Sequence, residues 1–550
     1  MQSTGPGAGR ARPSWRRLAG ALVVMLGLVG AGAGLGVGAG QASAADLLVR
    51  TTGGLVLGAG MGGIENFLGI RYAEPPTGAL RWAAPEPVKP WAGVRSASAY
   101  GSYCPQPRGL RSPTIVVDED CLFINVQRPA ATRPDARLPV FVYIHGGGYT
   151  SGSSARDGQD LLVRRDGIIG VTMNYRLGAL GFLAVPPLAA GSGAAGDYGL
   201  LDQQLALRWV RDNIAAFGGD PARVTIGGES AGGYSVCAHL VAPGSRGLFA
   251  QAIIQSGSCF THLLVRSEAD GSRFARAVGC AEPATMLACL RAKPVVDLLD
   301  RQAGGYVPTR GNSVLPDDPR LMVARGDFAR VPVLIGSTRD EERSFTMGAI
   351  GWSPARYAGE IRRRFGRDGR TVLAAYPPPP AGALPAAPAY QLAAAGTDGG
   401  ILGSDNVGWG IGGCATAALR DTLGRRVPVY GYEFAYRDGP GWYPIPGYVW
   451  GAGHATELVY LYPGHDGGQN YAHFDARERA LSDEMVRYWG AFVANGRPEV
   501  VGLADWPAFA PGHDILSLSV GQPEVESASA FATAHRCALW DRLAGDPVQP

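Results

Sequence analysis

Short apolar runs recur along the chain and alternate with helix-like segments. Leu200–Phe217 carries apolar residues at helical spacing, so it is predicted to be an amphipathic helix. Alternation of this kind predicts an α/β fold with a mainly parallel central sheet and helices on both faces. The runs that are expected to be strands are Leu138–Ile144, Gly167–Asn174, Val224–Ile226, Ala252–Gln255, Val331–Ile335 and Val427–Phe434.

The N-terminal residues follow a different pattern. Four arginines, the last two being Arg16 and Arg17, precede an uncharged run from Leu18 to Gly40, and Ala42-Ser43-Ala44 follows. This order predicts a secretory signal peptide at residues 1–44 and a single exported catalytic domain at residues 45–550. An uncleaved membrane anchor is the alternative, and the arginine pair leaves the Sec and twin-arginine routes open.

Composition limits the function classes. The chain has 550 residues and is 46% hydrophobic, which is ample for a large core. Residues 1–44 contain four arginines and no acids, so the formal net charge of the mature chain is 46 − 47 = −1. Neither nucleic acid nor another polyanion is therefore an expected partner. Eight cysteines in an exported chain suggest disulfides. No CxxC pair occurs, so a zinc site is not expected.

One serine lies among glycines directly after a predicted strand. The stretch Gly228-Glu229-Ser230-Ala231-Gly232 fits a nucleophile elbow, in which a strand turns abruptly into a helix and lifts the serine hydroxyl above the sheet. Bulky neighbours would collide there, and glycines avoid that collision. The amide of Ala231 at the helix start is expected to face a developing oxyanion. A plain glycine-rich turn is the alternative.

A serine nucleophile requires further groups. The stretch His145-Gly-Gly-Gly-Tyr149 follows a strong strand, and its glycine amides can approach a substrate oxygen. The acid and base are expected after the serine, in that order. Asp340, Glu341 and Glu342 follow a predicted strand, and their positions alone do not choose among them.

His454 is the preferred base because small residues surround it, in Gly451-Ala-Gly-His-Ala455. His465 and His513 each occur in Pro-Gly-His-Asp, a turn sequence, and are expected at the surface. His535 lies beside Cys537, near the C-terminus.

Together these motifs resemble the type-B carboxylesterase and cholinesterase family of α/β-hydrolases, over most of the mature chain. The resemblance implies the α/β-hydrolase fold, with extra helices over the active-site cleft. The stretches that carry it are GIRYAEPP (69–76), EDCL (119–122), HGGGY (145–149), NYRLG (174–178), LDQQ (201–204), FGGDP (217–221), GESAGG (228–233), QSGS (255–258) and GAGHATEL (451–458).

The resemblance also implies the site residues. Ser230 would be the nucleophile, Glu341 the acid and His454 the base, with an oxyanion hole formed by the amides of Gly147, Gly148 and Ala231. Where the family usually has glycine after the acid, this chain has Glu342. The implied reaction is hydrolysis of a small-molecule carboxylic ester through an acyl-enzyme, without metal or cofactor. The alternatives are a lipase, thioesterase or amidase on this fold, or a non-catalytic binding protein.

The family pattern implies structural pairs as well. It predicts salt bridges between Arg81 and Glu119 and between Arg176 and Asp202. It predicts disulfides Cys104–Cys121, Cys280–Cys289 and Cys414–Cys537, and leaves Cys237 and Cys259 as a possible fourth pair.

The Cys104–Cys121 loop bears on substrate choice. Cholinesterases hold a quaternary ammonium group against a tryptophan in this loop, and here the loop has no aromatic residue but adds Arg108 and Arg111. Choline esters are therefore expected to be poor substrates, and neutral esters good ones. Phe345 or Trp352, beyond the acid turn, could supply an aromatic side chain instead. The sequence leaves the oligomeric state undetermined.

Overall fold

The computed structural model describes residues 47–107, 116–302, 304–400, 410–465, 469–509, 514–521 and 523–544. The predicted signal peptide, Arg108, Arg111 and His513 lie outside these ranges. Residues 41–550 form one compact unit. Within the described part, no helix is both long enough and apolar enough to cross a membrane.

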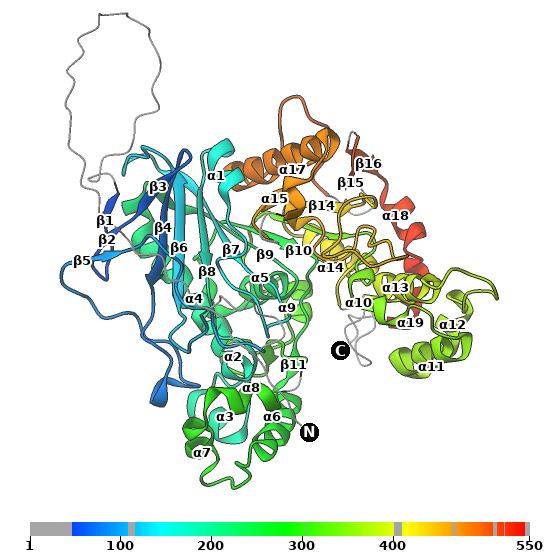
Figure 1. The fold of residues 1–550 in the computed structure, drawn as a ribbon, viewed down its shortest axis with the longest axis horizontal. Coiled ribbons are helices and arrows are strands. Elements are labelled where there is room, and N and C mark those ends of the chain that lie inside the picture. Colours follow the sequence, from blue (N-terminus) through cyan, green and yellow to red (C-terminus); the bar gives the residue numbers. More distant parts are fainter. Residues whose placement is uncertain are drawn as a thin grey trace, which may run out of the picture. The chain divides into compact units, whose positions relative to one another are not determined.

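An 11-stranded mixed sheet, in the order β16-β15-β14-β13-β10-β9-β7-β8-β6-β4-β3, is the centre of this unit (Figure 1). The pairs from β15 to β8 are parallel, and those at both ends are antiparallel. The strands are β3 (Ala59–Met61), β4 (Ile64–Arg71), β6 (Phe123–Pro129), β7 (Leu138–Ile144), β8 (Ile169–Met173), β9 (Gly219–Glu229), β10 (Gln251–Gln255), β13 (Val333–Thr338), β14 (Val429–Phe434), β15 (Ile515–Leu518) and β16 (Glu524–Glu526). The mainly parallel α/β fold is thus confirmed.

Two smaller sheets accompany the main one. They comprise β1 (Leu48–Arg50), β2 (Leu55–Leu57) and β5 (Val94–Ser96), and β11 (His262–Leu263) with β12 (Thr309–Arg310). The α-helices are α1 (Asp160–Asp166), α2 (Gly178–Phe182), α3 (Pro186–Ser192), α4 (Tyr198–Asn213), α5 (Ala231–Val241), α6 (Leu264–Ala277), α7 (Met286–Ala292), α8 (Val295–Arg301), α9 (Pro319–Arg325), α10 (Arg343–Thr346), α11 (Pro354–Phe365), α12 (Gly369–Ala375), α13 (Ala387–Gly399), α14 (Gly413–Gly424), α15 (Leu458–Leu461), α16 (Gln469–Ala472), α17 (Ala476–Asn495), α18 (Ala528–Ala534) and α19 (Cys537–Ala544).

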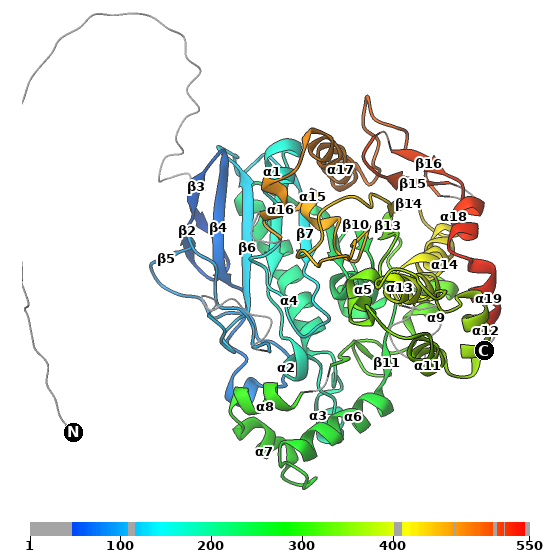
Figure 2. The ribbon, with the colours of Figure 1, turned by 45° about the vertical axis from the view of Figure 1, so that its right-hand side comes forward.

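Alternate residues of the central strands enter two different cores. Val140 and Val142 of β7 pack in one core with residues of α4 and α5, whereas Phe141 and Tyr143 pack in another with residues of α15 and α17. Because successive strand residues point to opposite faces, the two cores lie on opposite sides of the sheet. Figure 2 shows helices on both sides of it. A third core joins α11, α12 and α13 to α19.

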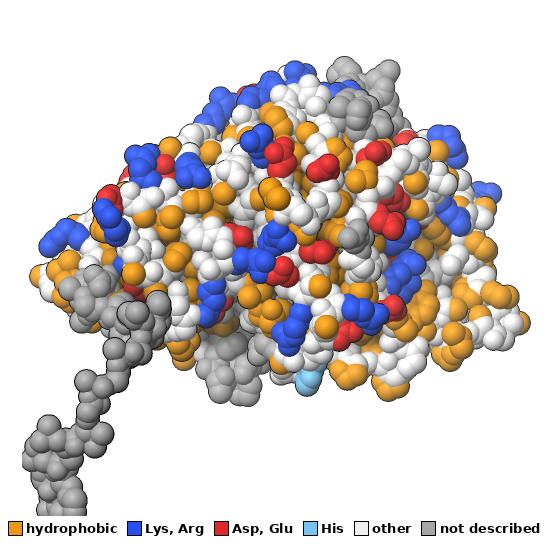
Figure 3. Space-filling view, turned by 90° about the horizontal axis from the view of Figure 1, so that it is seen from above, with side chains coloured by type: hydrophobic (Ala, Val, Ile, Leu, Met, Phe, Trp, Pro, Cys, Tyr) orange, Lys and Arg blue, Asp and Glu red, His pale blue; other side chains and the backbone are white. Residues whose placement is uncertain are grey.

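Basic and acidic side chains are interspersed on the face shown in Figure 3. Side chains of the two signs therefore lie close to one another on this face.

Candidate active site

Ser230 occupies the sharp turn between β9 and α5. Its backbone has φ 56° and ψ −122°, a conformation that non-glycine residues rarely adopt. The turn is possible because Gly232 lacks a side chain: a Cβ there would lie 2.0 Å from the carbonyl oxygen of Ile144 at the end of β7. Strained backbone of this kind gathers at functional sites.

Glu341 lies just beyond β13, and its carboxylate is held at both oxygens. The amide of Thr338 donates to Oε1 at 2.9 Å, and Oε2 lies 2.6 Å from Nδ1 of His454. The amide of His454 also donates to the carbonyl of Glu341 at 3.1 Å. Since the carboxylate accepts the Nδ1 proton, the other ring nitrogen, Nε2, is left to act as a base.

The side chains next to Glu341 have other partners. Asp340 forms a two-bond ion pair with Arg437, at 2.7 Å for each bond. The Glu342 carboxylate lies 3.2 Å from Nη1 of Arg364, on α11. Only the carboxylate of Glu341 contacts His454 among these three.

His454 comes from the loop after β14, and glycines let this loop lie against the acid turn. A Cβ on Gly453 would lie 2.8 Å from Oγ of Ser344. His454 is 4% exposed, and Nε2 of its imidazole lies 3.0 Å from Oε1 of Glu229. Among the described residues, no hydrogen bond joins His454 to the Ser230 hydroxyl. In free enzymes this bond is often long, and it tightens when substrate is bound.

Burial and the charges of two carboxylates determine the protonation of His454. Burial opposes the imidazolium, but the carboxylates of Glu229 and Glu341 outweigh burial and raise the pKa of His454 well above 6.5. A third acid, Glu457, is fully buried, and neither of its oxygens has a hydrogen-bond partner among the described residues. Burial, followed by the charges of Glu229 and Glu341, raises the pKa of Glu457 well above its usual value and favours the neutral acid.

The HGGGY stretch adopts left-handed backbone at three successive residues: Gly147 (φ 100°), Gly148 (φ 61°) and Tyr149 (φ 57°). A Cβ on the preceding Gly146 would lie 3.2 Å from the Cβ of Ser230, so the loop passes beside the elbow. The amides of Gly147, Gly148 and Ala231 donate to no other group in the described part of the chain. Such unused donors beside a serine can bind an oxyanion.

An aromatic shelf, formed by Phe345 and Trp442, lies beside the imidazole. These two residues are 44% and 43% exposed. The Phe345 ring centre lies 5.0 Å from that of His454 and 6.5 Å from that of Trp442. Trp352, in contrast, is covered by Arg356 at 4.3 Å. Of the two aromatics proposed from the sequence, only Phe345 adjoins the histidine in this structure.

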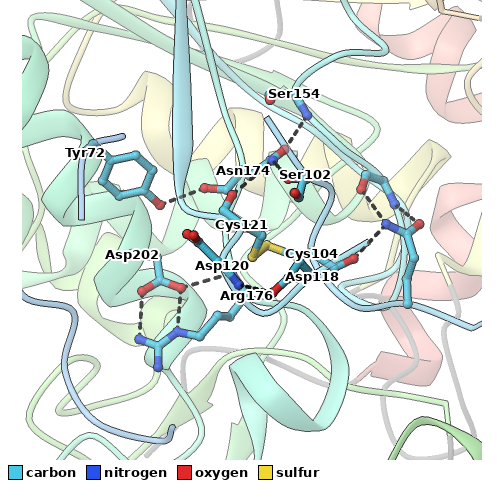
Figure 4. Close-up of a disulfide and its surroundings, with 12 residues drawn as sticks. Tyr72, Ser102, Cys104, Asp118, Asp120, Cys121, Ser154, Asn174, Arg176 and Asp202 are labelled. Carbon is cyan, nitrogen blue, oxygen red and sulfur yellow. Dashed lines mark hydrogen bonds and ion pairs between the residues drawn. A yellow bond between two sulfur atoms is a disulfide. The ribbon is translucent and has the colours of Figure 1, made fainter. Parts of the chain in front are cut away.

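Disulfides and ion pairs support the loops around the site. Figure 4 shows Cys104–Cys121 with Asn174, which donates to the Cys121 carbonyl at 3.1 Å, and the nearby pair Arg176–Asp202. Gln106 extends this network to the glycine-rich loop, because its amide exchanges two 3.1 Å hydrogen bonds with the backbone of Gly152. The structure also contains Cys237–Cys259, Cys280–Cys289, Cys414–Cys537 and the Arg81–Glu119 salt bridge.

Sequence reasoning missed or misplaced several residues. It gave no role to Glu229 or Glu457, although both occur within recognised motifs. Glu229 contacts His454, and Glu457 interacts electrostatically with it. The prediction that His465 lies at the surface was wrong: its side chain is 9% exposed, and its Nδ1 lies 2.5 Å from the buried Asp157. Arg156 contacts the other ring nitrogen of His465 at 2.8 Å, so this histidine is fixed in a polar cluster.

Comparisons with known proteins are consistent across sequence and structure. The model of the carboxylesterase family matches residues 45–353 and 410–540. The chain is 32% identical to a cocaine esterase of Homo sapiens over 533 residues, covering 88% of each protein. It is 34% identical to pyrethroid hydrolase Ces2e of Rattus norvegicus over 514 residues, covering 88% of this chain and 87% of that one. The solved structure of a PNB esterase superposes with a TM-score of 0.73 at 30% identity, covering 89% of this chain and all of that one.

Proposed function

This chain belongs to the carboxylesterase family and is a carboxylic-ester hydrolase, and we propose that it is an exported serine esterase with the triad Ser230, His454 and Glu341. The observation that carries the proposal is the 2.6 Å contact between Glu341 and His454, next to the strained turn at Ser230. In this proposal, residues 45–550 form the single catalytic domain that remains after cleavage of the signal peptide at residues 1–44. Four disulfides fit a protein of the extracellular space or the secretory pathway.

The proposed mechanism has two symmetrical halves. His454 takes the Ser230 proton at Nε2 as the hydroxyl oxygen attacks the ester carbonyl, and the amides of Gly147, Gly148 and Ala231 stabilise the oxyanion. The imidazolium then protonates the leaving alcohol, and an acyl-enzyme remains. Water attacks the acyl-enzyme by the same route and releases the acid. Glu341 keeps the imidazole in the required tautomer and stabilises its charged form.

The substrates proposed are uncharged esters with short or medium acyl chains, including esters that carry an aromatic ring. The aromatic shelf beside His454 supports this choice, because exposed rings bind planar apolar groups well. Two relatives are named a cocaine esterase and a pyrethroid hydrolase, which fits a proposal of small-molecule ester substrates.

The test uses the mature protein and a fluorophosphonate probe, which phosphonylates an activated serine. Wild-type protein should be labelled and should hydrolyse p-nitrophenyl butyrate, whereas Ser230→Ala should do neither while remaining folded. Labelling of Ser230→Ala at the wild-type rate would overturn the assignment. A panel of esters that vary in acyl and alcohol size would then define the preferred substrate.

A further inference from the structure

Tyr149 is a large side chain at a backbone position that normally favours glycine. It follows two glycines with positive φ, and its own φ is 57°. Left-handed backbone costs a non-glycine residue about 1–2 kcal/mol, so the surroundings must hold it in place. Its carbonyl accepts a 2.6 Å hydrogen bond from the Gly178 amide, and its ring packs against Phe182 at 4.6 Å.

The Tyr149 hydroxyl reaches across to α5. It lies 3.2 Å from Oγ of Ser235, and both side chains are buried. Ser235 is one helical turn beyond Ala231, so the two residues lie on the same side of α5. The loop that bears Tyr149 carries two of the proposed oxyanion donors, Gly147 and Gly148, and α5 begins with the third. This contact therefore joins the two halves of the proposed oxyanion hole.

A buried chain of hydrogen bonds, the relay from Ser235 through Gln203 and His239 to Ser245, holds the Ser235 hydroxyl in place. Nε2 of Gln203 donates to Oγ of Ser235 at 3.1 Å, and Oε1 of Gln203 lies 2.9 Å from Nε2 of His239. Because an amide oxygen can only accept, Nε2 of His239 carries a proton. Nδ1 then accepts from the Ser245 hydroxyl at 2.8 Å. Burial, aided by the charge of Arg208, lowers the pKa of His239 to about 3, so the ring stays neutral and the relay keeps one direction.

We propose that Tyr149 is a positioning residue for the oxyanion hole: its hydroxyl bond to Ser235 holds the Gly147 and Gly148 amides in register with that of Ala231. The proposal rests on the serine-esterase function proposed above. A contact between the two segments matters for the mechanism, because the loop after β7 and the start of α5 each supply donors that must converge on one oxygen atom. A small displacement of donors strongly reduces their stabilisation of a transition state.

Tyr149→Phe tests this role, since it removes the hydroxyl and keeps the ring on Phe182. For p-nitrophenyl butyrate, kcat should fall about tenfold while KM stays within about twofold. The serine hydroxyl adds to the carbonyl of an aryl trifluoromethyl ketone, gives its proton to His454 and turns the carbonyl oxygen into an oxyanion. The inhibition constant of this ketone should therefore rise by a similar factor. The affinity for the secondary alcohol of the same skeleton, which forms no oxyanion, should not change. A purely structural role would weaken both ligands together.

Two further variants sharpen the result. Ser235→Ala removes the same bond from the α5 side and should show the same selective loss, and the double variant should lose little more than either single one. Tyr357→Phe is the matched control, because its buried hydroxyl donates to a carbonyl, that of Tyr376, at 2.9 Å; its kcat should equal that of wild type. An unchanged kcat in Tyr149→Phe, or a loss shared equally by the ketone and the alcohol, would refute the positioning role. A wild-type protein that resists fluorophosphonate would instead refute the proposed function.

Discussion

Nε2 of His454 lies 3.0 Å from Oε1 of Glu229, the residue immediately before the proposed nucleophile. The imidazole is thus flanked by two buried carboxylates, with Glu341 at its other nitrogen. Both charges favour the imidazolium, which is the form that exists after His454 has taken the serine proton. The same charges raise the pKa of His454 in the free enzyme, so the imidazole stays protonated at a higher pH than an isolated one.

The pH dependence should reflect this arrangement. A general base must be neutral in the free enzyme, so kcat/KM should rise with pH as His454 loses its proton. Because the pKa of His454 is raised, the midpoint should lie above the usual imidazole value of about 6.5. Glu229→Gln removes one of the two charges and should lower that midpoint by roughly 1–2 pH units. Stopped assays of kcat/KM between pH 5 and pH 10 measure both profiles.

Glu342→Gln is the control for the Glu229 variant. It also removes a buried carboxylate, but that carboxylate is paired with Arg364 rather than with the imidazole. Its profile should stay close to that of wild type. Equal shifts in the two variants would mean that general burial, not contact with Glu229, sets the pKa of His454.

Ser230→Ala should abolish turnover without unfolding the protein. Loss of a triad nucleophile costs on the order of 10⁶ in kcat. The variant should retain the thermal midpoint of wild type within a few degrees or exceed it, because alanine at this strained turn removes only a hydroxyl group. Activity within about tenfold of wild type is incompatible with the proposed nucleophile.

The three adjacent carboxylates should respond differently to amide substitution. Glu341→Gln keeps the shape of the side chain but favours the wrong imidazole tautomer, so kcat should fall about 10⁴-fold. Asp340→Asn weakens the pair with Arg437 and should mainly lower thermal stability. Glu342→Gln should leave kcat close to that of wild type, because its carboxylate is paired with Arg364. If Glu342→Gln were the most damaging of the three, His454 would have a different acid partner in solution.

The disulfides should contribute unequally to stability. Cys414–Cys537 spans 123 residues, whereas Cys280–Cys289 spans 9. In the chain-entropy account, the longer loop stabilises by about 2 kcal/mol more, because it restricts the unfolded chain more strongly. Replacing each pair by alanines and measuring unfolding in urea compares them. A larger loss from the Cys280–Cys289 pair would show that folded-state packing dominates. Non-reducing peptide mapping should also recover Cys237–Cys259.

The sequence predicted what local patterns determine, and it failed where polar residues are buried. The elbow was readable because the strand, the glycines and the helix are contiguous. Strands β4 and β6 were missed because they contain Glu65, Gln127 and Arg128, which look like surface residues. In the structure Arg128 and Glu65 are paired at 2.6 Å and are buried. Pairing offsets part of the cost of burying such charges, and a pattern of apolar residues cannot reveal the pairing.

The role of Glu229 could not be predicted for a different reason. It lies within the motif that identified Ser230, yet its partner His454 comes from a loop more than 200 residues later. Only the paired strands β9, β10, β13 and β14 bring the two segments together. Position along the chain could not choose between Glu341 and Glu342 either, because the two side chains are identical and adjacent. The family resemblance implied Glu341, and in the structure its carboxylate is the one that contacts His454.

The aromatic shelf leads to the last prediction, which concerns substrate choice. Phe345 and Trp442 present exposed rings next to His454, and aromatic contacts of this kind are worth about 0.5–1.5 kcal/mol beyond simple burial. An aryl ester should therefore be hydrolysed with about three- to tenfold higher kcat/KM than an alkyl ester of equal length and similar leaving-group pKa. Phe345→Ala and Trp442→Ala should each reduce this preference. Trp352→Ala should not, because Arg356 covers that ring.

Choline esters provide the sharper comparison, because aromatic rings can also bind a cation. A desolvated cation–π contact is worth about 2 kcal/mol, or roughly thirtyfold in binding. The disulfide loop in which cholinesterases place their tryptophan contains no aromatic residue in this chain. The shelf rings are close to half exposed, so water competes for a cation there. An uncharged butyrate ester of similar size should therefore be hydrolysed with higher kcat/KM than butyrylcholine. A clear preference for butyrylcholine, lost in Trp442→Ala, would show that the shelf is a cation site instead.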